Sequence, residues 1–326
     1  MSPPTPLRRV QALQRHLRIS PVTLGIALAS LVVVVVVVVV LTRLPQHLAA
    51  TRGFRWELAG AAALVVPLIY LGNTTSLVAS AGWRPAFGRT LQLEVGEAIT
   101  LLLTPANAGS ATLRVRFLGR TGLSRAQAAT ATGIYSLLTT IVSSVAVALA
   151  TAIAASNVDL DRVRDRVPSS RWQLIVVLAA LVVVAGAAVR GPRFRRRLRH
   201  WLTDAAHYLR SVSRRPRDGA AIAFGELLTM TGQVACLALL VAATSNPVEP
   251  AVLLVATQLS FTATIAVPVP GGLGIPDAIL VAALVSTGSN ADGAVVAAVG
   301  YRMLTYWLPT LPGTALLYDL YRRRLV

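Results

Sequence analysis

The sequence predicts an all-α, polytopic membrane protein with about six to eight transmembrane helices. Apolar residues make up 55% of the 326 residues and charged residues 13%, and the charged share is about half that of an ordinary globular domain. Several apolar stretches reach membrane length, and two further ones are interrupted by glycine and proline. Because unpaired backbone groups are costly inside lipid, we expect each interruption to form the turn of a re-entrant helical hairpin.

The first apolar stretch, residues 20–42, contains nine consecutive valines, Val32 to Val40. A helix of this length covers about 34 Å, enough for a hydrocarbon core of about 30 Å. A cleaved signal peptide would have a shorter apolar core, so we expect this stretch to be a retained anchor. The other membrane-length stretches are 57–82, 126–155, 172–190, 220–244, 251–267 and 293–315, and the shorter ones are 90–104 and 277–289.

Every basic residue is an arginine, and the formal net charge is +18. Ten arginines lie in residues 190–217, between apolar stretches, which is typical of a cytoplasmic loop under the positive-inside rule. The charge therefore indicates membrane topology, and we expect no nucleic-acid partner. The single cysteine, Cys236, lies in an apolar run and excludes an intrachain disulfide.

Arginine positions favour a topology with both termini in the cytoplasm. It places 23 arginines inside, seven outside and Arg302 within the membrane. The alternative topology has the N-terminus outside and 90–104 as a full span, and it places 20 inside and ten outside. The two hairpins then enter from opposite faces, as an inverted repeat requires. The predicted organisation is a cytoplasmic segment 1–19, one transmembrane domain 20–318 with halves 20–155 and 172–318 around the loop 190–217, and a cytoplasmic tail 319–326.

The second interruption runs from Pro268 to Asp277. Its glycines permit left-handed backbone and close approach of a ligand, and its prolines prevent a regular helix. Asp277 begins the next apolar run, so a helix N-terminus there would suit an anionic head group. A tight loop outside the membrane is the alternative. The substrate-binding candidates are Gly271, Gly272, Gly274 and Asp277.

The first interruption, residues 104–110, contains Asn107 and Gly109, which are also candidates for substrate binding. Arg114 and Arg116 follow it, and arginine can bind a lipid phosphate through two parallel hydrogen bonds. The alternative for both arginines is ordinary flanking of a cytoplasmic loop.

Three carboxylates in apolar surroundings are candidates for ion or proton coupling, because intramembrane acids mark such paths. Glu94 and Glu97 share one helix face, and Glu226 lies one to two turns into its stretch. The alternative for the first two is an interfacial position beside Arg84 or Arg89.

Arg302 lies deep in the last apolar stretch and needs a partner. Asp277 and Glu226 are the acids that could reach it. The pair could be purely structural, or Arg302 could contact a lipid head group.

No enzyme signature is present. The four histidines, His16, His47, His200 and His207, lack metal-ligand spacing, and no nucleophile elbow, zinc-protease motif or P-loop occurs. We expect neither enzymatic activity nor a metal or other cofactor.

The segment Pro268-Val-Pro-Gly-Gly-Leu-Gly274, followed by Asp277-Ala278, resembles a signature of the lysylphosphatidylglycerol synthase transmembrane-region family, where a glutamate stands in place of Asp277. Arg302-Met-Leu-Thr-Tyr-Trp-Leu-Pro309 is similar to the closing arginine span of that family, and Thr104-Pro-Ala106 and Arg116-Phe-Leu118 are similar to its first-half motif. The resemblance covers roughly residues 57–318. It implies a lipid flippase without the soluble aminoacyl-transferase domain.

These observations predict a protein of the bacterial cytoplasmic membrane that moves an anionic phospholipid or a lipid-linked precursor between leaflets. A non-transporting, lipid-binding scaffold or regulator is the alternative, and an intramembrane transferase with Asp277 or Glu226 as base is a third reading. Membrane lipid is the expected partner, and a homo-oligomer is compatible with the sequence.

Overall fold

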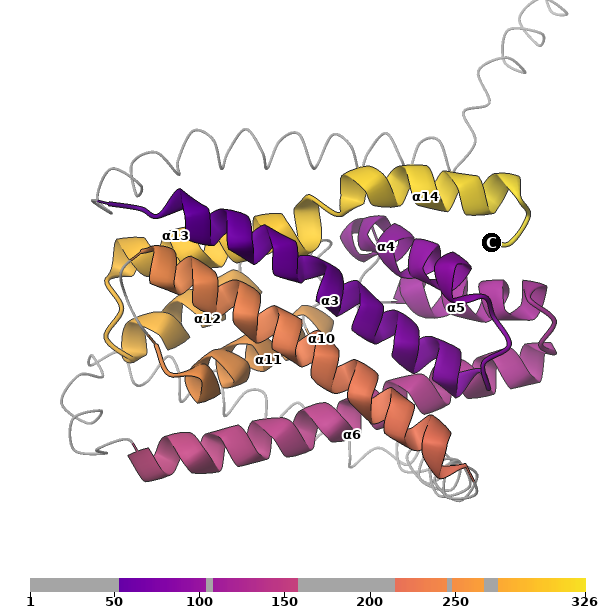
Figure 1. Cartoon of the computed structure of the whole chain (residues 1–326), viewed down its shortest axis with the longest axis horizontal. Helices are drawn as coiled ribbons and strands as arrows, with labels where there is room; N and C mark the ends of the chain where they lie inside the picture. Colours follow the sequence, from indigo (N-terminus) through magenta and orange to yellow (C-terminus); the bar gives the residue numbers. More distant parts are fainter. Residues whose placement is uncertain (1–52, 104–107, 158–214, 245–247, 267–274) are drawn as a thin grey trace, which may run out of the picture. The chain divides into compact units, whose positions relative to one another are not determined.

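The computed structural model describes residues 53–103, 108–157, 215–244, 248–266 and 275–326, and these are helical with no strand among them. The predicted all-α polytopic class is therefore confirmed (Figure 1). The helices are α3 (Trp56–Ser80), α4 (Phe87–Leu103), α5 (Ala108–Arg120), α6 (Arg125–Asn157), α10 (Pro216–Ala243), α11 (Pro250–Ala266), α12 (Ile275–Ser286), α13 (Ala291–Arg302) and α14 (Thr310–Arg322).

Three of the described helices, α3, α6 and α10, are long and apolar enough to cross a membrane. Helix α3 has 25 residues, which corresponds to about 38 Å. They match the predicted stretches 57–82, 126–155 and 220–244 closely, because an uninterrupted apolar run of this length leaves few other options. The predicted spans 20–42 and 172–190 lie outside the described residues.

Helices α3 and α10 are antiparallel and pack at very close range, as Figure 1 shows. Gly72 and Gly225 form the contact: a Cβ atom on Gly72 would collide with the carbonyl oxygen of Gly225, and the reverse also holds. The Ser76 hydroxyl donates to the carbonyl of Ile222 at 3.0 Å. Small residues allow such backbone approach in membranes, where packing replaces hydrophobic association.

Both glycine–proline interruptions separate pairs of short helices. Helix α4 has 17 residues and α5 has 13, about 25 and 20 Å. The Thr100 and Ser110 hydroxyls lie 3.1 Å apart, so these two helices fold back on each other. Helices α11 and α12, with 17 and 12 residues, also pack together. The turns themselves, 104–107 and 267–274, lie outside the described residues.

The last apolar stretch differs from the prediction of one seamless span over 293–315. Helix α13 ends at Arg302, a π-helix occupies Met303–Trp307, and α14 begins at Thr310. Pro309 supplies the physical reason, because it has no N–H to donate to the preceding turn and its ring crowds that turn. Helix α14 then continues to Arg322, into the segment predicted as a tail.

Apolar side chains gather in two main clusters within the described part of the chain. One joins α3 and α10 to α11, α12 and α13, through Leu237, Leu253 and Leu280. The other joins α3 to α4, α5 and α6, through Leu93 and Phe117. Each short-helix pair thus packs against the helix that follows it, and α3 belongs to both clusters.

Candidate functional site

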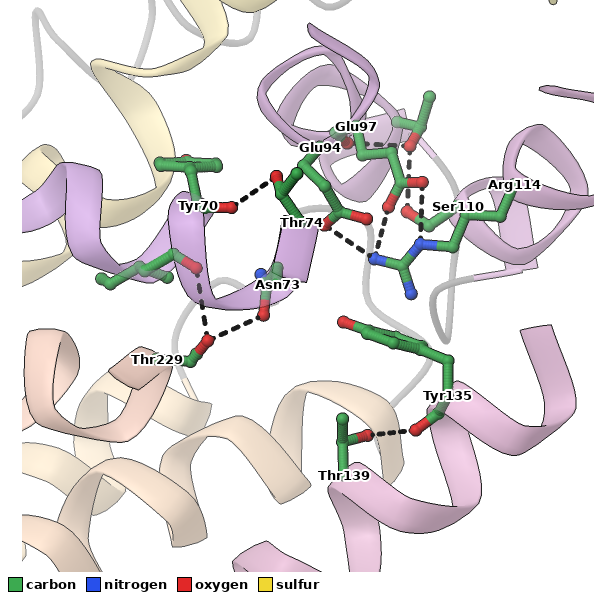
Figure 2. A network of polar contacts seen from close by, with 12 residues as sticks. Tyr70, Asn73, Thr74, Glu94, Glu97, Ser110, Arg114, Tyr135, Thr139 and Thr229 are labelled. Carbon is green, nitrogen blue, oxygen red and sulfur yellow. Dashed lines mark hydrogen bonds and ion pairs between the residues drawn. The ribbon is translucent and has the colours of Figure 1, made fainter. Parts of the chain in front are cut away.

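Arg114 on α5 is held by two carboxylates of α4 (Figure 2). Its Nε donates to Oε1 of Glu97 at 2.9 Å, and one terminal nitrogen lies 2.8 Å from Glu97 Oε2. The same nitrogen donates to Oε2 of Glu94 at 3.1 Å. Glu97 therefore receives a two-pronged arginine contact, the strong form of this interaction, whereas Glu94 is bound through one oxygen.

This Arg114 centre, defined as Arg114 with Glu94, Glu97 and Tyr135, is buried. The two glutamates are 4% and 3% exposed. The guanidinium carbon of Arg114 lies 4.4 Å from the centre of the Tyr135 ring on α6, in a cation–π arrangement. The second oxygen of Glu94, Oε1, has no hydrogen-bond partner in the described part of the structure.

Arg116 is exposed, so the structure does not bring it together with Arg114. Side chains two positions apart on an α-helix point about 200° away from each other, so Arg116 faces outward when Arg114 faces inward. The glutamates pair with Arg114 and not with Arg84 or Arg89, and Arg89 pairs with Asp319 at 3.1 Å. A hydrogen bond from Arg323, with a smaller effect of Arg89, lowers the pKa of the Asp319 carboxyl at the end of α14.

Arg302 is paired with Asp277, one of its two predicted partners. Its Nε donates to Oδ1 of Asp277 at 2.5 Å, and its guanidinium carbon lies 4.4 Å from the centre of the Tyr306 ring. The Arg302 side chain is 8% exposed, against 29% for Asp277. Asp277 lies in the first turn of α12, directly after the undescribed turn. We name Arg302, Asp277 and Tyr306 the Arg302 centre.

The π-helix after Arg302 also belongs to this region. Such helical insertions are rare and occur frequently at functional sites. Here the π-helix contributes Tyr306 to the guanidinium of Arg302 and exposes the carbonyl of Thr305.

Tyr70, near the middle of α3, contacts the π-helix that follows Arg302. Its hydroxyl donates to the carbonyl oxygen of Thr305 at 3.3 Å, an acceptor whose helical donor would be residue 309, a proline.

Glu226 is not a partner of Arg302. Its Oε1 accepts a 2.6 Å hydrogen bond from the Ser143 hydroxyl of α6. One turn further along α10, the Thr229 hydroxyl lies 3.1 Å from the side-chain oxygen of Asn73 (Figure 2). Glu226 therefore ties α10 to α6, and Thr229 ties it to α3.

An apolar groove of about 670 Å³ lies between α3, α4, the π-helix and α14. Tyr70 forms part of its wall, together with Pro67, Val95, Leu304 and Leu308. Its volume falls in the range of small-molecule sites, about 300–1,000 Å³. Because nearly all of the wall is hydrocarbon, the groove suits an apolar chain better than a polar molecule.

Several predicted site residues cannot be placed. Asn107, Gly271, Gly272 and Gly274 lie outside the described residues. Gly109 lies in the first turn of α5. Within the described ranges no group of histidine, cysteine, aspartate and glutamate has the geometry of a metal site.

Sequence reasoning missed the tyrosines. Tyr135 and Tyr306 each lie against an arginine guanidinium, and Tyr70 donates to the carbonyl of Thr305. The available signal was a hydroxyl inside an apolar helix, which needs a partner when buried.

The family described as "Lysylphosphatidylglycerol synthase TM region" matches residues 22–313, which is most of the chain. No significant match exists among curated proteins or among solved structures.

Proposed function

Because the chain belongs to the lysylphosphatidylglycerol synthase transmembrane-region family, we propose that it moves an anionic phospholipid or a lipid-linked precursor between membrane leaflets. Membership and the long apolar helices establish a multi-pass membrane protein tied to lipid metabolism or translocation. Location in the cytoplasmic membrane, cytoplasmic termini and a carrier role in place of an enzymatic one are parts of the proposal.

The observation that carries the proposal is the asymmetric ion pair of Arg302 and Asp277. The arginine is nearly enclosed, while the aspartate is 29% exposed. A buried guanidinium must stay neutralised, and a lipid phosphate offers the same oxygen geometry as a carboxylate. A phosphate can therefore replace Asp277 at Arg302 without leaving a buried charge unpaired. Reversal of this exchange releases the lipid.

The position of Asp277 supports the exchange. It lies at the N-terminal end of α12, where free N–H groups and the helix dipole favour a negative group. Broken helices whose N-termini point at an anionic substrate are a known device of membrane transporters. In this proposal the two short-helix pairs are re-entrant and enter from opposite faces.

The structure changes the role proposed for the first-half arginines. Arg114 is already neutralised by two carboxylates, so an anion gains little there. Exposed Arg116 remains available to attract anionic lipid near the surface, a contribution of about 1 kcal/mol. The apolar groove along Tyr70 can accommodate a hydrocarbon chain of the same lipid while its head group is at Arg302.

Translocation by the purified protein in vesicles tests the proposal. A fluorescent phosphatidylglycerol analogue in the inner leaflet should become accessible to a membrane-impermeant quencher faster than in protein-free vesicles. Asp277→Asn and Arg302→Gln should each remove most of this acceleration. Arg217→Gln, at an exposed position near the start of α10, is the matched control and should retain it.

The same experiment separates the alternatives. Lipid binding without any acceleration would support the scaffold or regulator. A chemically altered lipid recovered from the vesicles would support a transferase. Acceleration that survives both substitutions would show that the Arg302 centre does not carry transport.

A further inference from the structure

The charge balance of the Arg114 centre carries a second inference. Two carboxylates face one guanidinium, so the fully ionised cluster has an excess negative charge. All three side chains are largely buried. An uncompensated buried charge is so costly that such a group normally neutralises instead.

The geometry identifies the carboxyl group that is neutralised. Both oxygens of Glu97 contact Arg114, as expected for an ionised carboxylate. Glu94 contacts Arg114 through Oε2 only, and its Oε1 is buried with no hydrogen-bond partner in the described structure. A buried oxygen without a hydrogen-bond partner costs more free energy when the carboxyl group is ionised than when it is protonated and neutral.

The neighbouring groups do not supply the missing positive charge. Tyr135 of α6 lies against the Arg114 guanidinium and Tyr70 lies on α3 (Figure 2), and both hydroxyls are neutral at ordinary pH. Helix α14 contacts α4 near Gly96 through Gly313 and Leu317, which do not titrate.

The next charged groups lie further off. Glu226 of α10 accepts a hydrogen bond from Ser143 of α6 and supplies no positive charge. Arg302 lies beyond Tyr306 and is paired with Asp277. The Arg114 centre therefore needs one positive charge from outside the protein.

We propose that Glu94 and Glu97 share one exchangeable proton, carried by Glu94 in this structure, and that the transport cycle takes up and releases it. Uptake converts the Glu94 carboxylate to a carboxylic acid, and release returns the proton to water. Release requires that water reach Glu94, so proton exchange is tied to an opening of α4 against α5. The claim that this site binds a proton does not depend on the proposed function, whereas the claim that the transport cycle uses the proton does.

Infrared difference spectroscopy of the full chain in lipid vesicles tests the proton directly. Between mildly acidic and alkaline buffer, the wild type should show the C=O band of a protonated buried acid. Glu94→Gln and Glu97→Gln should each remove that band, because the remaining carboxylate is then balanced by Arg114. Two variants keep the test usable if one does not fold.

Two further variants are controls. Glu57→Gln, at an exposed position of α3, should leave the spectrum unchanged. Glu226→Gln assigns any separate band of that buried acid. A spectrum with no acid band, or one whose bands survive both α4 substitutions, would overturn the inference.

A second measurement tests coupling. In vesicles with the membrane potential held at zero, a difference of one pH unit should bias the lipid between leaflets by about tenfold if one proton accompanies each lipid. Glu94→Gln should abolish the bias. Translocation with no pH bias would refute coupling while the infrared band still reports the proton, and a band without translocation would refute only the proposed function.

Discussion

Tyr70 donates its hydroxyl hydrogen to the backbone carbonyl of Thr305, 235 positions later in the chain. The carbonyl is available because residue 309, its donor in a regular helix, is a proline. The hydroxyl of an α3 side chain thus bonds a carbonyl oxygen that the proline in the last apolar stretch leaves without its usual helical donor. In the same stretch, the π-helix holds Tyr306 against the guanidinium of Arg302.

Tyr70→Phe should weaken this link without opening a cavity. Interhelical hydrogen bonds in membranes are worth about 0.6 kcal/mol on average, so we expect only a small decrease in the free energy of unfolding. We expect the rate of lipid translocation to fall clearly. Unfolding in detergent and lipid transfer in vesicles measure the two effects. Tyr318→Phe, at an exposed position of α14, is the control. Equal transport losses in the two variants would argue against a role for Tyr70.

The Arg302–Asp277 pair should respond unequally to removal of its members. Asp277→Asn takes the carboxylate away from a buried guanidinium, which costs about 3 kcal/mol or more. Arg302→Gln leaves a carboxylate that is 29% exposed, so we expect a smaller loss. The double variant should be more stable than Asp277→Asn alone. Additive losses in a double-mutant cycle would show that the two side chains are not coupled.

Arg114 and Arg116 form a natural matched pair, two positions apart on one helix. Arg114→Gln should cost about 3–5 kcal/mol because it strips a buried ion pair of its cation. Arg116→Gln should change stability by no more than about 0.5 kcal/mol, since the side chain is exposed. Denaturation of both variants in the same detergent compares them. Similar losses would contradict the buried position of Arg114.

The close approach of α3 and α10 depends on glycine. Gly72→Ala and Gly225→Ala should each destabilise by about 1–3 kcal/mol, because the added methyl group meets backbone and hydroxyl oxygens. Gly133→Ala in α6 meets no described atom within contact range, and should stabilise the helix by about 0.4–1 kcal/mol. Thermal unfolding distinguishes the two classes. A tolerated Gly72→Ala would mean that the helices lie further apart.

The long helices and the short-helix pairs could be predicted from sequence because the residue types along the chain determine where they begin and end. Apolar runs fix α3, α6 and α10, and the glycine–proline segments fix where α4 ends and α12 begins. The exposed position of Arg116 also follows from helix periodicity once Arg114 is known to face inward.

The ion pairs could be predicted only in part. Asp277 could be named as a partner of Arg302, since both lie in apolar surroundings with few other charges. The pairing of Arg114 with Glu94 and Glu97 depends on α5 folding back on α4. In the sequence, Arg84 and Arg89 lie closer to both glutamates than Arg114 does. The π-helix was not predicted, because Pro309 signals a break but not its form.

Head-group selectivity tests the central claim most directly. Purified protein in vesicles should move fluorescent phosphatidylglycerol at least about ten times faster than the matching phosphatidylcholine, a difference of about 1.4 kcal/mol. In the Arg302→Gln variant the two rates should be nearly equal. Equal rates in the wild type, or a preference for the anionic lipid that persists without the arginine, would contradict the account.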